Sequence, residues 1–309
     1  MEKCYIGVDV GGTTVKIGCF DSKAVLLYKY EIPTRTEENG KYILEDIVLS
    51  LKKEHCFGDI MGIGIGVPGP VTDDGTVLNC INLGWGIVNV PCEVKKYIDV
   101  PAVKAGNDAN MAALGEMFMG AGAGSSDVAM LTLGTGVGGG IVRDGRIVNG
   151  IHGAAGEIGH MPVVYDDNMP LCNCGKRGCL EQVASATGIV RTTKEILNQT
   201  KDSSVLRDME CFTAKDVFDA AKENDVLALK AVDKLAFYLG VAMANIACVM
   251  DPEVFIIGGG VSAAGDILLE KVSEEYRKKA FNPSKGTAVR LATLGNDAGI
   301  YGAVKLVLD

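Results

Sequence analysis

Three short apolar runs separated by polar turns open the chain. Residues 4–8, 15–20 and 24–32 are rich in hydrophobic side chains, and glycine, aspartate and serine lie between them. Short apolar runs bounded by such turn residues are typical of β-strands. The sequence therefore predicts that the protein begins with a small β-sheet.

Beyond these runs, strand-like and helix-like segments alternate. Apolar residues recur near every 3.6 positions from about residue 40 to residue 54, which predicts a helix. Helical patterns also dominate from residue 184 to residue 250. The remaining expected elements are strands at 60–67, 128–133, 138–143, 254–257 and 288–294, and helices at 107–119, after the glycine turn that follows 257, and from 296. This order of elements is that of an α/β protein.

A turn rich in glycine and threonine occurs between two strands near the start of each half, at residues 9–14 and 133–139. This weak internal symmetry favours two similar α/β lobes. The length of 309 residues agrees, because one core stops growing at roughly 250–300 residues. The segment 120–126, Gly-Ala-Gly-Ala-Gly-Ser-Ser, has the composition of a hinge between lobes.

Charge and composition exclude several kinds of partner. The net charge of −9 repels phosphate backbones and anionic lipids, so neither nucleic acid nor a membrane surface is expected as a partner. No apolar stretch approaches the roughly 20 residues that span a bilayer. The first residues lack the pattern of a secretory signal, and we therefore expect a cytoplasmic protein.

The first glycine turn carries the groups that a nucleotide phosphate needs. Glycines let backbone N–H groups approach closely, threonine hydroxyls donate, Lys16 adds positive charge, and Asp9 can hold a magnesium-bound water. A plain hairpin turn that uses glycine for positive φ is the alternative. Two further glycine turns favour contact with phosphate or adenosine. The residues assigned to the nucleotide are Asp9, Gly11, Gly12, Thr13, Thr14, Lys16, Gly134, Thr135, Gly136, Gly258, Gly259 and Gly260.

Asp108 is the candidate acid–base residue. It follows Asn107 and opens the helix expected at 107–119. Asparagine or aspartate before an apolar helix is also the usual N-cap, worth about 1 kcal/mol, and capping is the alternative role. The helix dipole favours a negative charge at this end, which suits a base that accepts a hydroxyl proton.

A cluster of cysteines predicts a zinc site. Cys172, Cys174 and Cys179 form a C-x-C-x4-C motif, and His160 lies twelve residues upstream. Three thiolates and one imidazole complete a tetrahedral zinc set, and a closed set of four ligands indicates a structural role. Incidental surface cysteines are the alternative.

Two glutamates flank this motif. Glu157 lies shortly before His160, and Glu181 lies two residues after Cys179. Carboxylates that a metal anchors close together are suitable acceptors for the vicinal hydroxyls of a sugar. Solvated surface charges are the alternative interpretation.

Taken together, these motifs resemble the ROK family of sugar kinases and repressors, and within it the bacterial glucokinases. The resemblance covers essentially the whole chain in order. Its most specific part is the cysteine motif with its flanking glutamates. The motifs that carry it are Asp9-Val-Gly-Gly-Thr-Thr14, Asn107-Asp-Ala-Asn110, Ala112-Ala-Leu-Gly-Glu116, Leu133-Gly-Thr-Gly-Val-Gly-Gly-Gly140, Glu157-Ile-Gly-His160 and Cys172-Asn-Cys-Gly-Lys-Arg-Gly-Cys-Leu-Glu181.

The resemblance implies an actin-like (ASKHA, ribonuclease H-like) α/β fold with two lobes and a cleft between them. The smaller lobe would comprise residues 1–118 plus 296–309, because the last helix returns to it. Residues 119–295 would form the larger lobe with the zinc loop. The resemblance also implies a homodimer or homotetramer. Repressors of the family carry an N-terminal helix-turn-helix, whereas the sequence given starts at the first expected strand, so DNA binding is not expected.

The resemblance further implies that Asp108 acts as the base on the sugar 6-hydroxyl and that His160 serves both zinc and sugar. The residues expected around the sugar are Gly69, Asn82, Asn107, Asp108, Glu157, His160 and Glu181.

The expected activity is that of a glycolytic glucokinase, which uses Mg-ATP to convert glucose into glucose 6-phosphate and releases ADP. Other acceptors stay open (N-acetylmannosamine, N-acetylglucosamine, mannose or fructose), as does a polyphosphate donor. A sugar-binding regulator without catalysis is an alternative from another class. An actin-like filament or chaperone ATPase is a third, but it would not need the zinc motif.

Overall fold

The computed structural model describes residues 3–54 and 59–308. The chain divides into two compact units. Unit 1 comprises Met1–Ser126, Gly140–Gly156 and Thr293–Asp309, and unit 2 comprises Asp127–Gly139 and Glu157–Ala292.

Unit 1 is built on a five-stranded sheet in the order β3-β2-β1-β4-β7. β1, β2 and β3 are antiparallel neighbours, whereas β4 and β7 continue the sheet parallel to β1. β3 alternates half-buried and exposed positions, as an edge strand with one face on the core does. The strands are β1 (Lys3–Val10), β2 (Thr14–Asp21), β3 (Leu26–Pro33), β4 (Asp59–Val67) and β7 (Ala102–Asn107).

The helices and short elements of unit 1 cover this sheet or connect its strands. α2 contributes five buried aliphatic side chains to the same hydrophobic core as β1 and β4. These elements are α1 (Glu37–Gly40), α2 (Ile43–Lys53), β5 (Thr76–Val77), the 3-10 turn Ile81–Leu83, β6 (Val88–Asn89), α3 (Val90–Val94), α4 (Asp108–Met119), the 3-10 turn Gly295–Asp297 and α10 (Ala298–Leu308).

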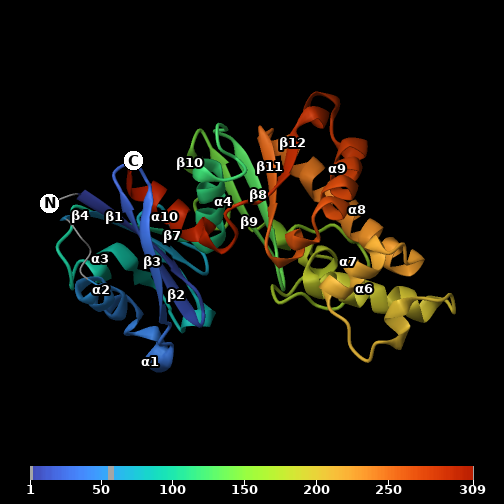
Figure 1. The fold of residues 1–309 in the computed structure, drawn as a ribbon, viewed down its shortest axis with the longest axis horizontal. Coiled ribbons are helices and arrows are strands. Elements are labelled where there is room, and N and C mark those ends of the chain that lie inside the picture. Colours follow the sequence, from blue (N-terminus) through green and yellow to red (C-terminus); the bar gives the residue numbers. More distant parts are fainter. Residues whose placement is uncertain (1–2, 55–58, 309) are drawn as a thin grey trace. The chain divides into compact units, whose positions relative to one another are not determined.

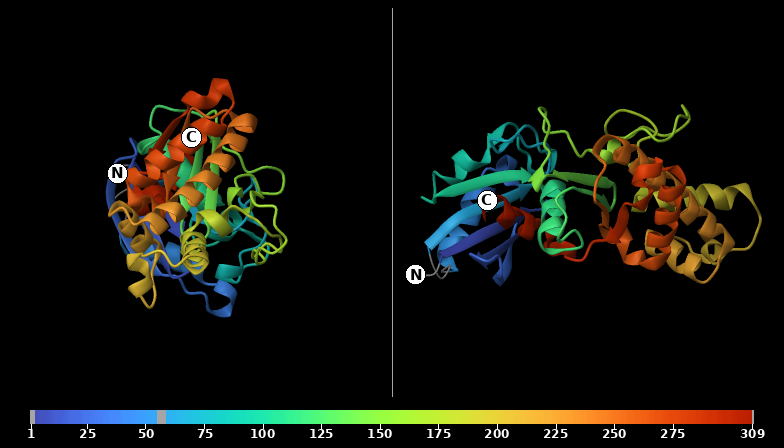
Figure 2. Two further views of the ribbon diagram at one scale, coloured as in Figure 1. Left: turned by 90° about the vertical axis from the view of Figure 1, so that its right-hand side faces the viewer. Right: turned by 90° about the horizontal axis from the view of Figure 1, so that it is seen from above.

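Helix α10 lies between the sheet and α4, although the two helices are far apart in the sequence (Figure 1 and Figure 2). The approach is so close that glycine is required on the facing elements. A Cβ atom at Gly64 on β4 would collide with the main chain of Ala303, and one at Gly115 on α4 would collide with the main chain of Ala298. The middle of α10 therefore packs closely on β4, and the second half of α4 packs on the start of α10.

A second five-stranded sheet has the order β10-β9-β8-β11-β12. β8 and β12 both pair with β11 in parallel, and every residue of β11 is buried. β9 runs from unit 2 into unit 1, since the units divide between Gly139 and Gly140. The strands are β8 (Val128–Leu133), β9 (Val137–Arg143), β10 (Arg146–Ile147), β11 (Val254–Gly258) and β12 (Ala288–Leu291).

Helices make up most of the rest of unit 2. α8 begins where Asp225 accepts hydrogen bonds from two backbone N–H groups, and its buried residues run along its whole length. The helices are α5 (Glu181–Ala184), α6 (Ala186–Gln199), α7 (Ala214–Lys222), α8 (Val226–Met250) and α9 (Asp266–Lys279). The 3-10 turns are Ile158–His160, Val205–Asp208, Gly260–Ala264 and Asn282–Gly286.

Most elements predicted from the sequence are confirmed within a few residues, several short elements were not predicted, and two of the differences have physical causes. The strand expected at 288–294 ends at Leu291, because the backbone N–H groups of Thr293 and Leu294 donate to the Glu116 carboxylate instead of to a neighbouring strand. The strand β7 was not predicted, since exposed Lys104 interrupts its short apolar run.

The lobe boundaries inferred from the sequence stay a prediction. Unit 1 includes residues 140–156 because these contact its other segments. Asn149 donates to Asp73, and the backbone of Gly153 lies against Val71. No helix in the described part of the chain combines the length and the apolar character needed to cross a bilayer.

Candidate active site and metal centre

Asp108 is the first residue of α4, and its neighbour Asn107 carries out the capping. The Asn107 side-chain oxygen accepts from the backbone N–H of Asn110 at 3.1 Å, and its backbone is extended, as in an N-cap. The Asp108 Oδ1 atom accepts from the backbone N–H of Ala109 at 2.8 Å and from Asn107 Nδ2 at 2.9 Å. Asn107 is therefore the N-cap, while Asp108 satisfies one further N–H of the first turn through Oδ1.

Gly69 and Asn107 lie together beside Asp108. Asn107 Nδ2 also donates to the carbonyl of Gly69 at 3.1 Å. Gly69 has a φ of 94°, and a Cβ atom there would lie 2.5 Å from the carbonyl oxygen of Asn79, so the fold itself requires glycine. Asn82 is exposed on the 3-10 turn that follows Cys80. Asp108 is close enough to Cys80 to raise the pKa of that thiol, although burial is the larger cause.

Asp9 lies at the end of β1 in the same unit and faces Asp108. The pKa of Asp9 is raised to about 6; burial is the largest cause, the negative charge of Asp108 adds to the rise, and the positive charge of Lys16 opposes it. The Asp9 carboxyl group also lies against the backbone of Gly299 in the first turn of α10. Two carboxyl groups with one lysine nearby form an electronegative site that suits a divalent cation.

The backbone conformation does not explain why the first glycine turn contains glycine. Neither Gly11 nor Gly12 has a positive φ, so the hairpin alternative based on positive φ is wrong. A Cβ atom at Gly12 would meet nothing within 4 Å. The Gly11 N–H donates to the Thr14 carbonyl, and Thr34 Oγ1 donates to the Gly11 carbonyl at 2.7 Å. The fold thus fixes the turn but leaves Gly12 without a structural reason, as is expected where a ligand approaches the backbone.

Thr13 and Thr14 of this turn are exposed, whereas Lys16 is already paired. Lys16 Nζ donates to the carbonyl of Asn296 at 2.6 Å and lies 3.4 Å from Asp297 Oδ1. Lys16 therefore connects the strand after the turn to the segment before α10.

The glycine turns of unit 2 divide into two kinds. At Gly259 φ is 80° and a Cβ atom would lie 2.6 Å from the Leu133 backbone, while at Gly258 it would meet Met130 Cε at the same distance. The fold requires glycine at Gly259, whereas at Gly258 the short contact is with the flexible end of the Met130 side chain. Gly134 and Gly260 have neither a positive φ nor a neighbour within 4 Å of a Cβ atom.

Gly134 and Gly260 both line a cavity of about 440 Å³ in unit 2. Thr135 lines the same cavity, and its carbonyl accepts from Thr187 Oγ1 at 2.7 Å. Most of the remaining lining comes from α7 and the turn Gly260–Ala264, and sequence reasoning missed it because no motif marks these residues. They are Ala186, Ala214, Lys215, Phe218, Asp219, Lys222, Val261, Ala263 and Ala264.

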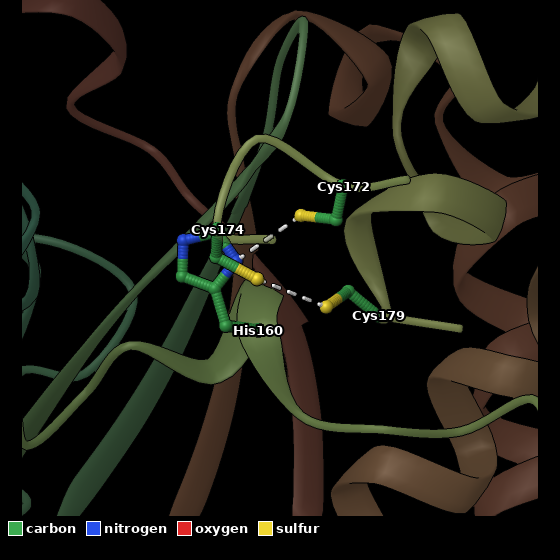
Figure 3. Close-up of side chains that lie close together, drawn as sticks. All are labelled: His160, Cys172, Cys174 and Cys179. Carbon is green, nitrogen blue, oxygen red and sulfur yellow. Dashed lines mark hydrogen bonds between the residues drawn. The ribbon is translucent and has the colours of Figure 1, made fainter. Parts of the chain in front are cut away.

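His160, Cys172, Cys174 and Cys179 converge as the sequence predicted (Figure 3). The four ligand atoms lie within 4.8 Å of one another; Cys174 Sγ is 3.5 Å from Cys179 Sγ, and Cys172 Sγ is 3.6 Å from His160 Nδ1. Tetrahedral zinc, with bonds of about 2.3 Å to sulfur and 2.0–2.1 Å to nitrogen, separates its ligands by roughly 3.5–3.8 Å. The donor set and its spacing therefore fit zinc.

Both flanking glutamates lie beside this His/Cys cluster. His160 Nδ1 faces the sulfurs and lies 3.7 Å from Glu181 Oε1, while Nε2 lies 4.0 Å from Glu157 Oε2. Cys172 Sγ donates to Glu181 Oε1 at 2.8 Å. A Cβ atom at Gly136 would lie 2.5 Å from Glu181 Oε2, so Gly136 makes room for this carboxylate. Glu157, His160 and Glu181 thus form one polar group around the metal centre.

The predicted residues therefore form separate groups, each within one unit. Unit 1 holds the first glycine turn and the group around Asp108, with Asp9, Gly69, Asn82 and Asn107. Unit 2 holds the metal centre with its two glutamates, and the cavity with the other glycine turns.

Comparison with known proteins places this geometry in a family. Residues 5–309 match the model of the ROK family. The chain is 44% identical over 316 residues to a glucokinase of Halalkalibacterium halodurans, covering 99% of this chain and 95% of that protein. It is 37% identical over 310 residues to a glucokinase of Thermotoga maritima, covering 98% of this chain and 97% of that protein.

A solved structure agrees with this assignment. A ROK family glucokinase from Streptomyces griseus, crystallised with glucose and AMPPNP, matches with a TM-score of 0.76 and 34% identity over 98% of both chains. The likeness confirms the actin-like α/β fold expected from the sequence. The chain therefore belongs to the ROK family.

Proposed function

We propose that the protein is an ATP-dependent glucokinase, which transfers the γ-phosphoryl group of ATP to O6 of glucose and releases glucose 6-phosphate and ADP. The observation that carries the proposal is the division of roles at the start of α4. Asn107 caps the helix, and Asp108 presents a carboxylate whose orientation is set by two hydrogen bonds to Oδ1. Relatives of 44% and 37% identity that are named glucokinases support the choice of reaction and sugar.

In this mechanism Asp108 accepts the proton of the 6-hydroxyl as that oxygen attacks the phosphorus atom. The step forms the O6–P bond, breaks the bond from phosphorus to the β,γ-bridging oxygen, and leaves the proton on Asp108. Asn107 contributes by holding Oδ1 in place, so that proton transfer does not wait for the carboxylate to rotate. Gly69 shares the same Asn107 amide, and exposed Asn82 is the further polar contact that we assign to the sugar in unit 1.

The sugar contacts of unit 2 are assigned to Glu157, His160 and Glu181. Both glutamates accept hydrogen bonds from sugar hydroxyls, and His160 Nε2 faces away from the cysteine sulfurs. His160 Nδ1 and the three cysteines would hold a structural zinc ion, which supplies a rigid anchor for the loop. The backbone N–H of Lys176 lowers the pKa of Cys174, whereas burial raises the pKa of Cys172 and Cys179, so zinc binding would have to displace the protons of these two thiols.

The nucleotide is assigned to the glycine turns. Gly12, Gly134 and Gly260 let backbone N–H groups approach a polyphosphate, and the cavity beside α7 is large enough for adenosine. Asp9 would hold a magnesium ion with its waters, which neutralises charge on the phosphates. A cytoplasmic location, a role in glycolysis, and a homodimer or homotetramer are part of the same proposal.

Replacement of Asp108 by Asn tests the mechanism. The amide keeps the size of the carboxyl group but accepts no proton, so turnover in a coupled ADP-release assay should fall by about 10²–10⁴-fold. Glucose affinity measured by calorimetry should stay within about fivefold. Asp266→Asn is the matched control, because Asp266 is likewise the first residue of a helix, and it should retain full activity. Turnover of Asp108→Asn within tenfold of the wild type refutes the assignment of the base.

A panel of hexoses at fixed ATP tests the substrate. Glucose should give the highest kcat/KM among glucose, mannose, fructose, N-acetylglucosamine and N-acetylmannosamine. A higher value for one of the others would replace glucose in the proposal and leave the role of Asp108 intact. Sugar-dependent stabilisation without ADP release would instead favour a non-catalytic regulator.

A further inference from the structure

Among the described residues, Glu116 is the only charged residue that is buried. It has no role in the mechanism proposed above. Its exposed fraction is 0%. It lies on α4, two helical turns after Asp108, which corresponds to roughly 12 Å along the helix axis. A buried carboxylate is costly unless several donors satisfy it, so its partners indicate what it is there to hold.

The partners of Glu116 come from two segments that are far apart in the sequence. Oε1 accepts from the backbone N–H of Leu294 at 2.7 Å and of Thr293 at 3.0 Å. Oε2 accepts from the backbone N–H of Ala121 at 2.8 Å and of Thr293 at 3.1 Å, and also from Thr293 Oγ1 at 3.4 Å. One side chain thus holds the backbone of both segments.

These two segments lead into two of the four connections between the units. The chain first leaves unit 1 after Ser126 and returns to it for the last time at Thr293, and it also crosses between Gly139 and Gly140 and between Gly156 and Glu157. On the outgoing side the Glu116 carbonyl also accepts from the N–H groups of Gly120 and Gly122, at 3.1 and 2.9 Å. A Cβ atom at Gly120 would collide with the Glu116 carboxylate, so glycine at this position keeps the space for it.

The returning segment is fixed at its other end as well. Lys16 Nζ donates to the carbonyl of Asn296 at 2.6 Å, and Asp297 pairs with Lys16 at 3.4 Å and with Lys29 at 2.5 Å. Between Thr293 and the start of α10 the backbone is therefore anchored on both sides. If α4 moves at Glu116, we expect the segment from Thr293 to α10 to move with it, because both ends of the segment are held by hydrogen bonds.

We propose that Glu116 is a positioning residue that couples the sugar site to the nucleotide site, by tying both of these connections to the helix that begins with Asp108. The inference rests on the proposed function. A sugar hydroxyl bound at Asp108 restrains the start of α4, and two turns of helix transmit that restraint to Glu116. Glu116 then restrains two of the four connections to unit 2, where the cavity beside α7 lies. Coupling of this kind is a free energy shared by two binding sites, and it is measurable without catalysis.

The test compares the affinity for Mg-AMPPNP with and without glucose, by calorimetry, in the wild type and in Glu116→Gln. Glutamine keeps the shape of the side chain but places an NH2 group where an oxygen accepted, which leaves one connection without its acceptor. In the wild type glucose should raise nucleotide affinity by about 5–150-fold, the usual range for coupled sites. In Glu116→Gln that factor should fall below about threefold, while nucleotide affinity without glucose stays within about threefold of the wild type.

Two further variants separate positioning from stability. Gly120→Ala keeps the carboxylate but displaces it, so it should lose the coupling in the same way, and it serves if Glu116→Gln does not fold. Asp21→Asn is the matched control, because Asp21 also accepts two backbone N–H groups in unit 1, at the turn before β3, far from either connection along the chain. It should lower the melting temperature and keep the coupling.

Coupling that survives in both Glu116→Gln and Gly120→Ala overturns the inference. Equal loss of coupling in Asp21→Asn also overturns it, because general loss of stability would then explain the effect. A wild-type protein that phosphorylates no sugar refutes the proposed function instead, so the two failures are distinguishable.

Discussion

Replacement of Asp9 by Asn should stabilise the ligand-free protein at neutral pH while abolishing its activity. Burial and the charge of Asp108 raise the pKa of Asp9 from its ordinary value of 3.8 to about 6. Between these two pH values the folded state holds a proton that the unfolded state has released. Stability therefore falls as the pH rises through this window, and above pH 6 the full cost of the buried charge is present.

The size of this cost follows from the pKa difference. A rise from 3.8 to about 6 corresponds to about 3 kcal/mol, because each pKa unit is worth about 1.36 kcal/mol. Asn carries no charge and occupies the same space beside Gly299, so the variant avoids this cost. The variant should exceed the wild type in unfolding free energy by about 2–3 kcal/mol at pH 7 and should match it near pH 4.

Urea denaturation followed by circular dichroism, at half-unit steps from pH 4 to pH 8 without nucleotide or metal, measures this difference. Asp74→Asn is the control of opposite sign, because the hydroxyls of Thr72 and Thr76 lower the pKa of Asp74, so its replacement should destabilise the protein at pH 7. A difference between Asp9→Asn and the wild type that does not shrink as the pH falls from 6.5 to 4 would refute the reasoning. The same holds for a variant that is no more stable than the wild type at pH 7.

Two further predictions concern the glycine turns and the metal centre. Gly260→Ala should leave stability unchanged or raise it by about 0.4–1 kcal/mol, because neither φ nor space opposes a Cβ atom, yet the KM for ATP should rise severalfold. Gly64→Ala is the contrasting variant: its Cβ atom collides with the main chain of Ala303, so it should yield insoluble protein. An unchanged KM for ATP in Gly260→Ala would contradict the assignment of that turn to the nucleotide. Cys174→Ser should lower zinc content by elemental analysis, melting temperature and glucose affinity together, because metal binding also contributes to folding. Full zinc content with unchanged glucose affinity would show that Cys174 is not a ligand.

The features predicted best from the sequence are those determined by residues close together along the chain. Spacing alone predicted that His160 and the three cysteines converge, because C-x-C-x4-C brings three sulfurs together within eight residues and His160 needs only a short loop to join them. The strands β1 and β2 were located because glycine and threonine mark the turn between them. The helix starting at Asp108 was also found, although which of two adjacent polar residues caps it became clear only from the hydrogen bonds.

The features that sequence missed depend on partners far along the chain. Nothing in the sequence indicates that the Lys16 ammonium group contacts the segment before α10, and its assignment to phosphate stays a prediction. Glu116 has the appearance of an ordinary charged helix residue until Thr293 and Leu294 are placed beside it. The cavity wall formed by α7 is a face of an ordinary amphipathic helix, so nothing in its local pattern distinguishes a ligand pocket from packing.

The insertion of α10 between the first sheet and α4 has a consequence for biosynthesis. On β1 and β4, Gly7 and Gly64 lie against the main chain of Ile300 and Ala303 in α10. At about 5–20 residues per second, a ribosome needs roughly 10–50 s to proceed from the end of β4 to the end of α10. During that interval the face of the nascent sheet that packs against α10 is exposed, and we expect a chaperone to bind it. Most of unit 2, in contrast, is synthesised before α10 and can form its core earlier.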